Sequence, residues 1–260
     1  MPSGKQSKRR RGAVQAPPPP TRGRRQASPR VLIAAAAVLV LVVVGLVLGV
    51  VLASGGGGSS GASGARLPDA GDVQTLLRGI PQNGNTLGKA SAPVTMVEYV
   101  DLQCPFCQEF ETQAMPTLLS RYVRSGKLKV EARPVAIRGA DSVRGQSAAI
   151  AAGLQNKMFN FMQLLYDNQG VENSGWLNDS IVKSAAVSIP GLDVGQFVKD
   201  VNSSVVDDQV KGFDEQATAD ALAGTPTILV GKTGTKPRQV ALTAANDPSP
   251  VAAAIDAALR

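Results

Sequence analysis

The apolar residues of this chain form blocks of different length and spacing. Residues 31–52 are 22 consecutive positions without a charge. As a helix they span about 33 Å, enough to cross the apolar core of a bilayer. Lys and Arg flank only the N-terminal side, which predicts residues 1–30 in the cytoplasm and everything after residue 52 outside. A cleaved secretory signal ending near Ala53 is the alternative, but the length of the block favours an uncleaved anchor.

Polar segments lie on both sides of this block. Residues 1–30 contain four consecutive prolines among Arg, Ser and Gly, which predicts a disordered, basic tail. Residues 53–71 are rich in Gly and Ser and predict a flexible linker. Residues 72–260 have the composition and length of one globular domain. We therefore expect a tail, one transmembrane helix, a linker and a single folded domain.

Short apolar runs and a helical repeat open the folded part. Residues 94–100 predict a buried strand, and residues 127–135, with alternating apolar positions, predict a second. Between them, residues 105–124 predict a helix that Pro116 kinks or interrupts. A strand, a helix and a strand of these lengths predict a βαβ unit with a parallel strand pair.

A long helical region follows the second strand. Apolar residues recur at helical spacing from about residue 141 to 223. Residues 227–230 and 238–242 predict two more strands, and residues 248–259 predict a final helix, so the fold class is α/β. A Met and aromatic stripe in the helical region is interpreted as core packing, with a peptide groove as the alternative. The stripe comprises Met158, Phe159, Phe161, Met162, Leu164 and Leu165.

The net charge of +7 is a property of the tail. Residues 1–30 carry nine Lys and Arg and no acid, whereas the rest of the chain carries 18 basic against 20 acidic residues, a net charge of −2. Nucleic-acid binding is disfavoured, because it requires a basic face with base-contacting residues on a folded module.

The two cysteines of the chain, Cys104 and Cys107, carry its clearest chemical signal. They lie at the predicted junction of a strand and a helix, which is the layout of a dithiol redox site. The positive end of the helix dipole favours a thiolate there, and Pro105 suits the first helical position. One helical turn places both sulfurs on the same face, within reach of a disulfide.

Two other interpretations of the cysteine pair are weaker. A structural zinc site needs four ligands, and the chain has no histidine and no third cysteine. A purely structural disulfide would close so short a loop that it would remove little entropy from the unfolded chain. We therefore expect redox chemistry, with no metal and no other cofactor.

These motifs resemble the DsbA-like thiol–disulfide oxidoreductases of the thioredoxin superfamily. The resemblance covers residues 72–260 and implies a thioredoxin-like fold with a helical insertion at about 139–223. It rests on Cys104-Pro-Phe-Cys107 after Val97-Glu-Tyr-Val-Asp-Leu-Gln103, on Gly224-Thr-Pro-Thr227 before a strand, and on Leu87-Gly88 followed by Ala92-Pro93-Val94.

The resemblance also implies roles for single residues. Cys104 is the more exposed sulfur, which a substrate thiolate attacks, and Cys107 is its buried partner. Pro226 follows a cis peptide bond and lies beside the cysteines together with Thr225, whose backbone pairs with an extended substrate segment. An ordinary Thr-Pro turn is the alternative for this last pair.

Glu98 and Phe106 are further candidates. Glu98 interrupts an apolar strand where many thioredoxin-like proteins carry a buried acid, and a desolvated carboxyl there could exchange a proton with Cys107. A solvent-facing strand residue is the alternative. Phe106 replaces a His that strongly oxidising relatives often carry, so thiolate stabilisation must come from the helix start and backbone N–H groups. Phe106 could instead offer apolar surface to unfolded substrates.

The leading hypothesis is an anchored extracytoplasmic oxidase that introduces disulfides into exported, reduced proteins. The resemblance implies recycling by a quinone-linked membrane oxidase. A reductase or isomerase with the same site is the second hypothesis, because sequence does not fix the direction of electron flow. A tethered peptide-binding or chaperone module is the third. No additional dimerisation domain is visible, which favours a monomer.

Overall fold

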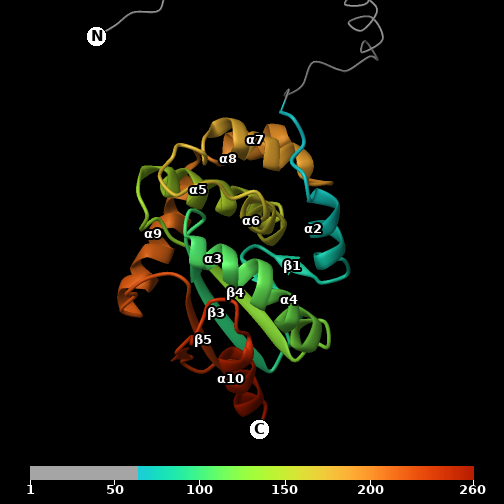
Figure 1. The fold of residues 1–260 in the computed structure, drawn as a ribbon, viewed down its shortest axis with the longest axis vertical. Coiled ribbons are helices and arrows are strands. Elements are labelled where there is room, and N and C mark those ends of the chain that lie inside the picture. Colours follow the sequence, from blue (N-terminus) through green and yellow to red (C-terminus); the bar gives the residue numbers. More distant parts are fainter. Residues whose placement is uncertain (1–63) are drawn as a thin grey trace, which may run out of the picture. The chain divides into compact units, whose positions relative to one another are not determined.

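The computed structural model describes residues 64–260 (Figure 1). The predicted tail, the predicted transmembrane helix and most of the predicted linker lie outside the described residues. Within residues 64–260, every helix is too short or too polar to cross a bilayer.

A six-stranded sheet with the strand order β1-β2-β4-β3-β5-β6 organises the described residues (Figure 1). Strands β3 and β4 run parallel, with Val94 beside Leu128 and Val100 beside Pro134, which confirms the predicted βαβ unit. Strand β5 pairs antiparallel with the other side of β3. The strands are β1 (Gln82–Asn83), β2 (Thr86–Leu87), β3 (Val94–Val100), β4 (Leu128–Pro134), β5 (Thr227–Lys232) and β6 (Arg238–Val240).

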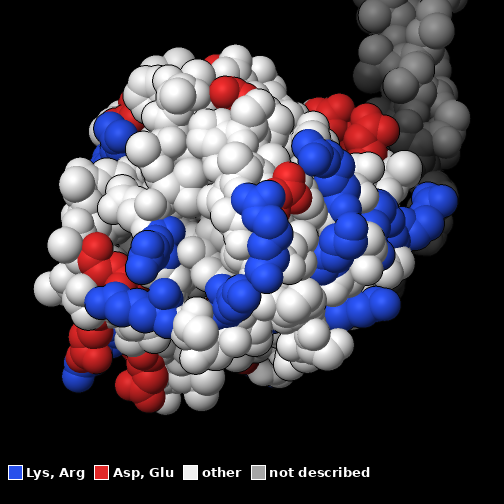
Figure 2. Space-filling view, turned by 90° about the horizontal axis from the view of Figure 1, so that it is seen from below, with Lys and Arg blue, Asp and Glu red and all other residues white. Residues whose placement is uncertain are grey.

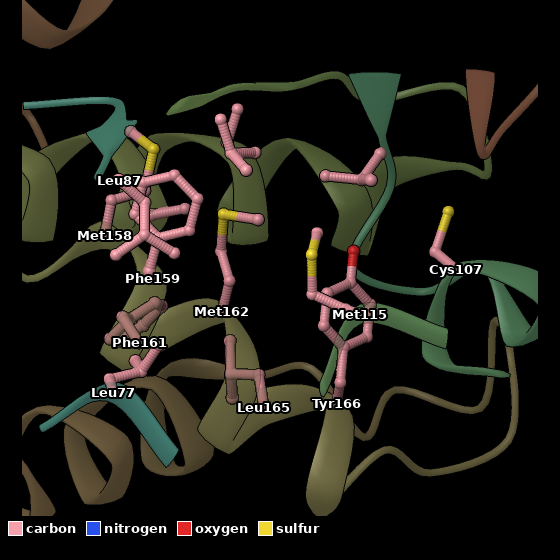
Figure 3. Packing of buried hydrophobic residues seen from close by; sticks show 14 of the residues in the cluster. Leu77, Leu87, Cys107, Met115, Met158, Phe159, Phe161, Met162, Leu165 and Tyr166 are labelled. Atoms are coloured by element: carbon pink, nitrogen blue, oxygen red, sulfur yellow. The ribbon is translucent and has the colours of Figure 1, made fainter. Parts of the chain in front are cut away.

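The predicted helical insertion is present between β4 and β5. Its second helix, α6, buries the Met and aromatic stripe against the sheet and the neighbouring helices (Figure 3), which confirms that the stripe is core. The helices of the insertion are α5 (Ala140–Leu154), α6 (Met158–Asp167), α7 (Asp179–Ser188), α8 (Val194–Asp200) and α9 (Ser204–Ala219).

The helix after the cysteine motif is less regular than the sequence predicts. It consists of α3 (Pro105–Glu109), the π-helical turn η1 (Phe110–Ala114), α4 (Met115–Leu118) and a second π-helical turn η2 (Leu119–Val123). The N–H of Met115 donates to the carbonyl of Phe110, five residues back. Pro116 has no N–H to continue the normal ladder, so the irregularity falls where the proline predicts a disturbance.

Both faces of strand β3 are covered. Val94, Met96 and Val100 pack into the main core, while Val97 and Tyr99 belong to a second buried cluster on the other face, completed by Val135, Ala217 and Leu229. Helix α10 (Ser249–Leu259), predicted from the sequence, supplies Val251, Ala252 and Ile255 to the main core. Because β3 is buried on both faces from Met96 to Val100, hydrophobic alternation there carries no information about orientation.

The first elements of the domain were not predicted. Helix α2 (Ala70–Leu77) buries Val73 and Leu77, and β1 and β2 form a short hairpin that pairs with β4. The N–H of Leu67 donates to Oγ of Ser188 at 2.8 Å. Residues of the predicted linker therefore already contact the helical insertion, and strands of two residues are too short for a periodicity signal.

Charge is distributed unevenly over the surface. Figure 2 shows the lower face of the view in Figure 1, where Lys and Arg side chains outnumber Asp and Glu. The near-neutral balance of the sequence after residue 30 therefore averages over a surface with a basic side.

Candidate active site

The cysteine motif lies where the carboxyl end of β3 passes into α3. Cys104 is the N-cap residue of α3 and Pro105 begins the helix. The fixed φ of proline suits this first position, and the first-turn N–H groups have no partner within the helix. The chain thus directs the positive end of a helix towards the first sulfur, as the sequence predicts.

Both cysteines carry free thiols and both side chains are fully buried. Neither sulfur is therefore exposed at the surface, and the expectation that Cys104 is the more exposed of the two stays a prediction. Segments distant in sequence cover Cys104: the thiol of Cys104 donates to the carbonyl oxygen of Thr225 at 3.3 Å, and the side chain of Arg138 approaches it from another loop. A motif alone gives no sign of such covering contacts.

The two thiols differ strongly in acidity. Hydrogen bonding with Cys107 lowers the pKa of Cys104 from 9.0 to about 5, against the opposing effect of burial. The side chain of Thr225 and the positive charge of Arg138 contribute to the same shift. Burial raises the pKa of Cys107 well above 9.0, and the neighbouring Cys104 adds to this. Near neutral pH the reduced site therefore holds one thiolate and one thiol.

Thr225 and Pro226 directly precede β5 in the sequence, and Thr225 contacts Cys104. The Thr225–Pro226 peptide bond is cis, as the resemblance implied. The Thr225 carbonyl can only accept a hydrogen bond, so it favours the thiol form of Cys104. The Thr225 hydroxyl is buried without a hydrogen-bond partner in the described part of the chain, and it is the group of this residue that can donate to a thiolate.

Arg138 is a site residue that the sequence analysis missed. Its Nη2 lies 3.7 Å from Sγ of Cys104, and its Nη1 lies 3.9 Å from a carboxylate oxygen of Glu172. The expectation that only the helix start and backbone N–H groups stabilise the thiolate is therefore wrong. Arg138 supplies the positive charge that Phe106 lacks, although Arg138 lies after β4 and not in the cysteine motif.

Asp101, also missed, anchors the loop that carries Arg138. The side chain is fully buried and accepts four hydrogen bonds. The donors are the N–H groups of Gln103, Ile137 and Arg138 and the hydroxyl of Ser142, at 2.8–2.9 Å. All four partners are donors, the pattern that fits a carboxylate. Asp101 follows β3 and Arg138 follows β4, and the carboxyl ends of parallel neighbours share one sheet edge, a signal that could have found both.

Glu98 points into the main core and is fully buried, so the solvent-facing alternative is wrong. Burial raises the pKa of Glu98 to about 8, and the neighbouring Glu111 moderates the shift. Burial also raises the pKa of Glu111 well above 4.5, and the negative charge of Glu98 adds to it. Glu111 lies in the π-helical turn η1, and nothing in its sequence context predicts that it shares a site with Glu98.

Tyr166 lies among the groups of this region. Its hydroxyl donates to the backbone carbonyl of Asp101 at 3.3 Å. Burial raises the pKa of Tyr166, and the negative charges of Cys107, Glu111 and Glu98 add to the effect. Figure 3 shows Tyr166 and Met115 between the core of α6 and Cys107. The buried acids and the second sulfur thus belong to one connected interior.

Apolar side chains remain exposed at the surface of the site. Phe106 is 57% exposed and Ile137, the neighbour of Arg138, is 49% exposed. Large apolar residues at such exposure are available to contact another polypeptide. The residues 64–260 contain no cluster of three or more His, Cys, Asp or Glu side chains that could hold a metal ion.

The sheet, the insertion and the dithiol at the start of α3 together define a DsbA-like protein disulfide oxidoreductase with a thioredoxin-like fold. The sequence pattern of the family described as Thioredoxin matches residues 82–256. The chain belongs to the thioredoxin family.

Individual relatives agree with this assignment. The "Probable disulfide bond formation protein D" of Bacillus cereus is 30% identical over 148 residues, which cover 56% of this chain and 68% of that protein. The structure of oxidised BdbD from Bacillus subtilis is similar with a TM-score of 0.60 and 20% identity, over 76% of this chain and 98% of that one. Wolbachia pipientis α-DsbA1 has a TM-score of 0.56 and 19% identity, over 72% and 96%. At this identity the two structures establish the fold alone.

Proposed function

We propose that this protein is a membrane-anchored, extracytoplasmic oxidase that introduces disulfides into exported, reduced proteins. The observation that carries the proposal is the opposite shift of the two thiols, with a stabilised thiolate at Cys104 and a protonated Cys107. A stabilised thiolate favours the reduced form of the enzyme, and an enzyme with a favoured reduced form oxidises its clients. The name of the Bacillus cereus relative, a disulfide bond formation protein, agrees with this direction.

The reaction balances as two thiol–disulfide exchanges. A client thiolate attacks Sγ of Cys104 in the Cys104–Cys107 disulfide, and Cys107 leaves as a thiolate and takes up a proton. A second client thiolate then attacks the client sulfur of the mixed disulfide, and Cys104 leaves as a thiolate. The client loses two electrons and the enzyme gains them. A quinone-linked membrane oxidase, which accepts these two electrons, restores the enzyme disulfide.

The remaining candidates act around these steps. Glu98, with a pKa of about 8, exchanges a proton with Cys107 as that sulfur leaves or attacks. The backbone of Thr225, next to Pro226, pairs with an extended client segment. Phe106 provides apolar contact for unfolded clients, supported by its exposed side chain.

The anchor places this chemistry outside the cytoplasm. The proposal uses the uncharged residues 31–52 as the single membrane helix and the basic residues 1–30 as the cytoplasmic tail. Disulfides form and persist in extracytoplasmic compartments.

The test uses membrane fractions from cells that express the full chain. These fractions are expected to oxidise a reduced model protein, and Cys104→Ser is expected to lower the rate at least ~100-fold because the attacked sulfur is gone. Ser249→Ala, at the start of α10, serves as the matched control. Full activity of Cys104→Ser would refute the site, and wild-type activity confined to the soluble fraction would refute the anchor.

The same preparation separates the other functions. Cys107→Ala is expected to accumulate mixed disulfides with clients, whereas a binding module would accumulate none. The equilibrium with glutathione gives the reduction potential: a value near those of strong oxidants supports the oxidase, and a thioredoxin-like value contradicts it in favour of a reductase.

A further inference from the structure

Two loops at the edge of the site are tied to the segment that leads into α3. Asp101 accepts the N–H groups of Ile137 and Arg138 at 2.8 and 2.9 Å. Two residues later, Oε1 of Gln103 accepts the N–H of Asn173 at 3.0 Å. Asp101 and Gln103 are both fully buried. Each of them therefore holds one loop, and these loops carry the opposite charges of Arg138 and Glu172.

Gly139 allows the two loops to meet. Its φ is +119°, and a Cβ at this position would lie 2.6 Å from Oδ1 of Asn173. Any other residue would be strained at this φ and would force the side chain of Asn173 to move, so the arrangement favours a glycine directly after Arg138.

The guanidinium of Arg138 is held between a sulfur and a carboxylate. Nη2 lies 3.7 Å from Sγ of Cys104, and Nη1 lies 3.9 Å from Glu172. Its Nε is buried without a hydrogen-bond partner among residues 64–260. The side chain is 32% exposed, so solvent screens its charge only partly. The bond from its backbone N–H to Asp101 holds the backbone in place.

We propose that Arg138 is a catalytic residue of this site. Its backbone is held by Asp101, and its guanidinium stabilises the thiolate of Cys104 when that sulfur leaves the mixed disulfide. Glu172 limits the effect because it pairs with the same guanidinium. The inference rests on the proposed function, since it concerns the second exchange of that reaction. Arg138 supplies no electron and no proton. Asp101 is its positioning residue.

The expected consequences follow from thiol chemistry. A better stabilised thiolate is a better leaving group, and it also stabilises the reduced enzyme, which makes the disulfide more oxidising. Arg138 thus supplies from the loop after β4 the charge that the motif lacks at Phe106.

The test measures the equilibrium with glutathione and the pH midpoint of thiolate absorbance for four purified full-length variants. Arg138→Gln is expected to shift the equilibrium about fivefold towards the oxidised enzyme, equivalent to a potential lower by about 20 mV, and to raise the pH midpoint. Arg138→Lys keeps the positive charge without the planar N–H donors of the guanidinium, and it is expected to reverse part of the shift seen in Arg138→Gln. Glu172→Gln is expected to shift the equilibrium in the opposite direction. Arg144→Gln is the matched control, since Arg144 pairs with Asp141 and Asp179 and not with a sulfur.

The outcomes separate this inference from the oxidase itself. An unchanged equilibrium and midpoint in folded Arg138→Gln, or an equal shift in Arg144→Gln, would overturn the role of Arg138 while the Cys104→Ser result stands. If the wild type oxidises no client, the proposed function fails, but a shift specific to Arg138 still supports its contact with the thiolate.

Discussion

Asp101 and Glu98 lie three residues apart in one segment, and both side chains are fully buried. Asp101 accepts four hydrogen bonds. Neither carboxyl oxygen of Glu98 has a hydrogen-bond partner within the described part of the chain. Burial raises the pKa of Glu98 to about 8. The difference teaches that burial alone does not decide the charge of an interior carboxyl, whereas the supply of donors does.

The largest effect is expected from removing the satisfied acid. Asp101→Ala leaves three backbone N–H groups and the Ser142 hydroxyl without their acceptor, and it is expected to lower the free energy of unfolding by about 3 kcal/mol. Urea denaturation at pH 7 measures the change. Asp179→Ala, a 93% exposed side chain paired with Arg144, is the control, with an expected loss of at most about 0.5 kcal/mol. Equal losses in the two variants would contradict the comparison.

An effect of opposite sign is expected from neutralising the unsatisfied acid. Because its folded pKa lies above 4.5, the folded state holds more protons between pH 4.5 and 8, and stability falls as the pH rises through this window. Glu98→Gln removes this dependence and is expected to raise the free energy of unfolding at pH 8 by about 2 kcal/mol, with little change at pH 4.

Urea denaturation at the two pH values measures this change, with Glu215→Gln on the exposed side of α9 as the control. A loss of stability at pH 8 in Glu98→Gln would show that the carboxylate is satisfied in solution, and the contrast with Asp101 would then disappear.

The smallest effect is expected at Tyr166, whose hydroxyl is bonded to the segment that carries the two acids. Tyr166→Phe removes one hydrogen bond of 3.3 Å to the backbone of Asp101, and a neutral bond of this kind contributes about 1 kcal/mol. The urea midpoint at constant denaturant slope measures the loss. A loss as large as that of Asp101→Ala would mean that Tyr166 belongs to the Asp101 network and does not merely adjoin it.

The sequence predicted those features that depend on local patterns. The Val-rich run 94–100, the alternation in 127–135 and the proline after Cys104 each have a local cause in burial, pleat or helix geometry. The parallel pair then follows from the short helical connection. These inferences were sufficient to place the cysteines at a helix start.

The features that were missed depend on contacts between distant segments. Arg138 reaches Cys104 from the loop after β4, and Glu111 meets Glu98 through a π-helical turn. Glu98 could not be oriented by alternation, since both faces of β3 are covered. The burial of Cys104 likewise comes from Thr225, 121 residues away. Such contacts leave no periodic trace in the sequence.

The covered position of Cys104 has a consequence for oxidative damage. Because the side chain of Cys104 is buried and bonded to the carbonyl of Thr225, an attacking group has to displace covering atoms before it reaches the sulfur. Damage to a thiol by small oxidants increases with its accessibility. The enclosure therefore lowers the exposure of a reactive sulfur to peroxide.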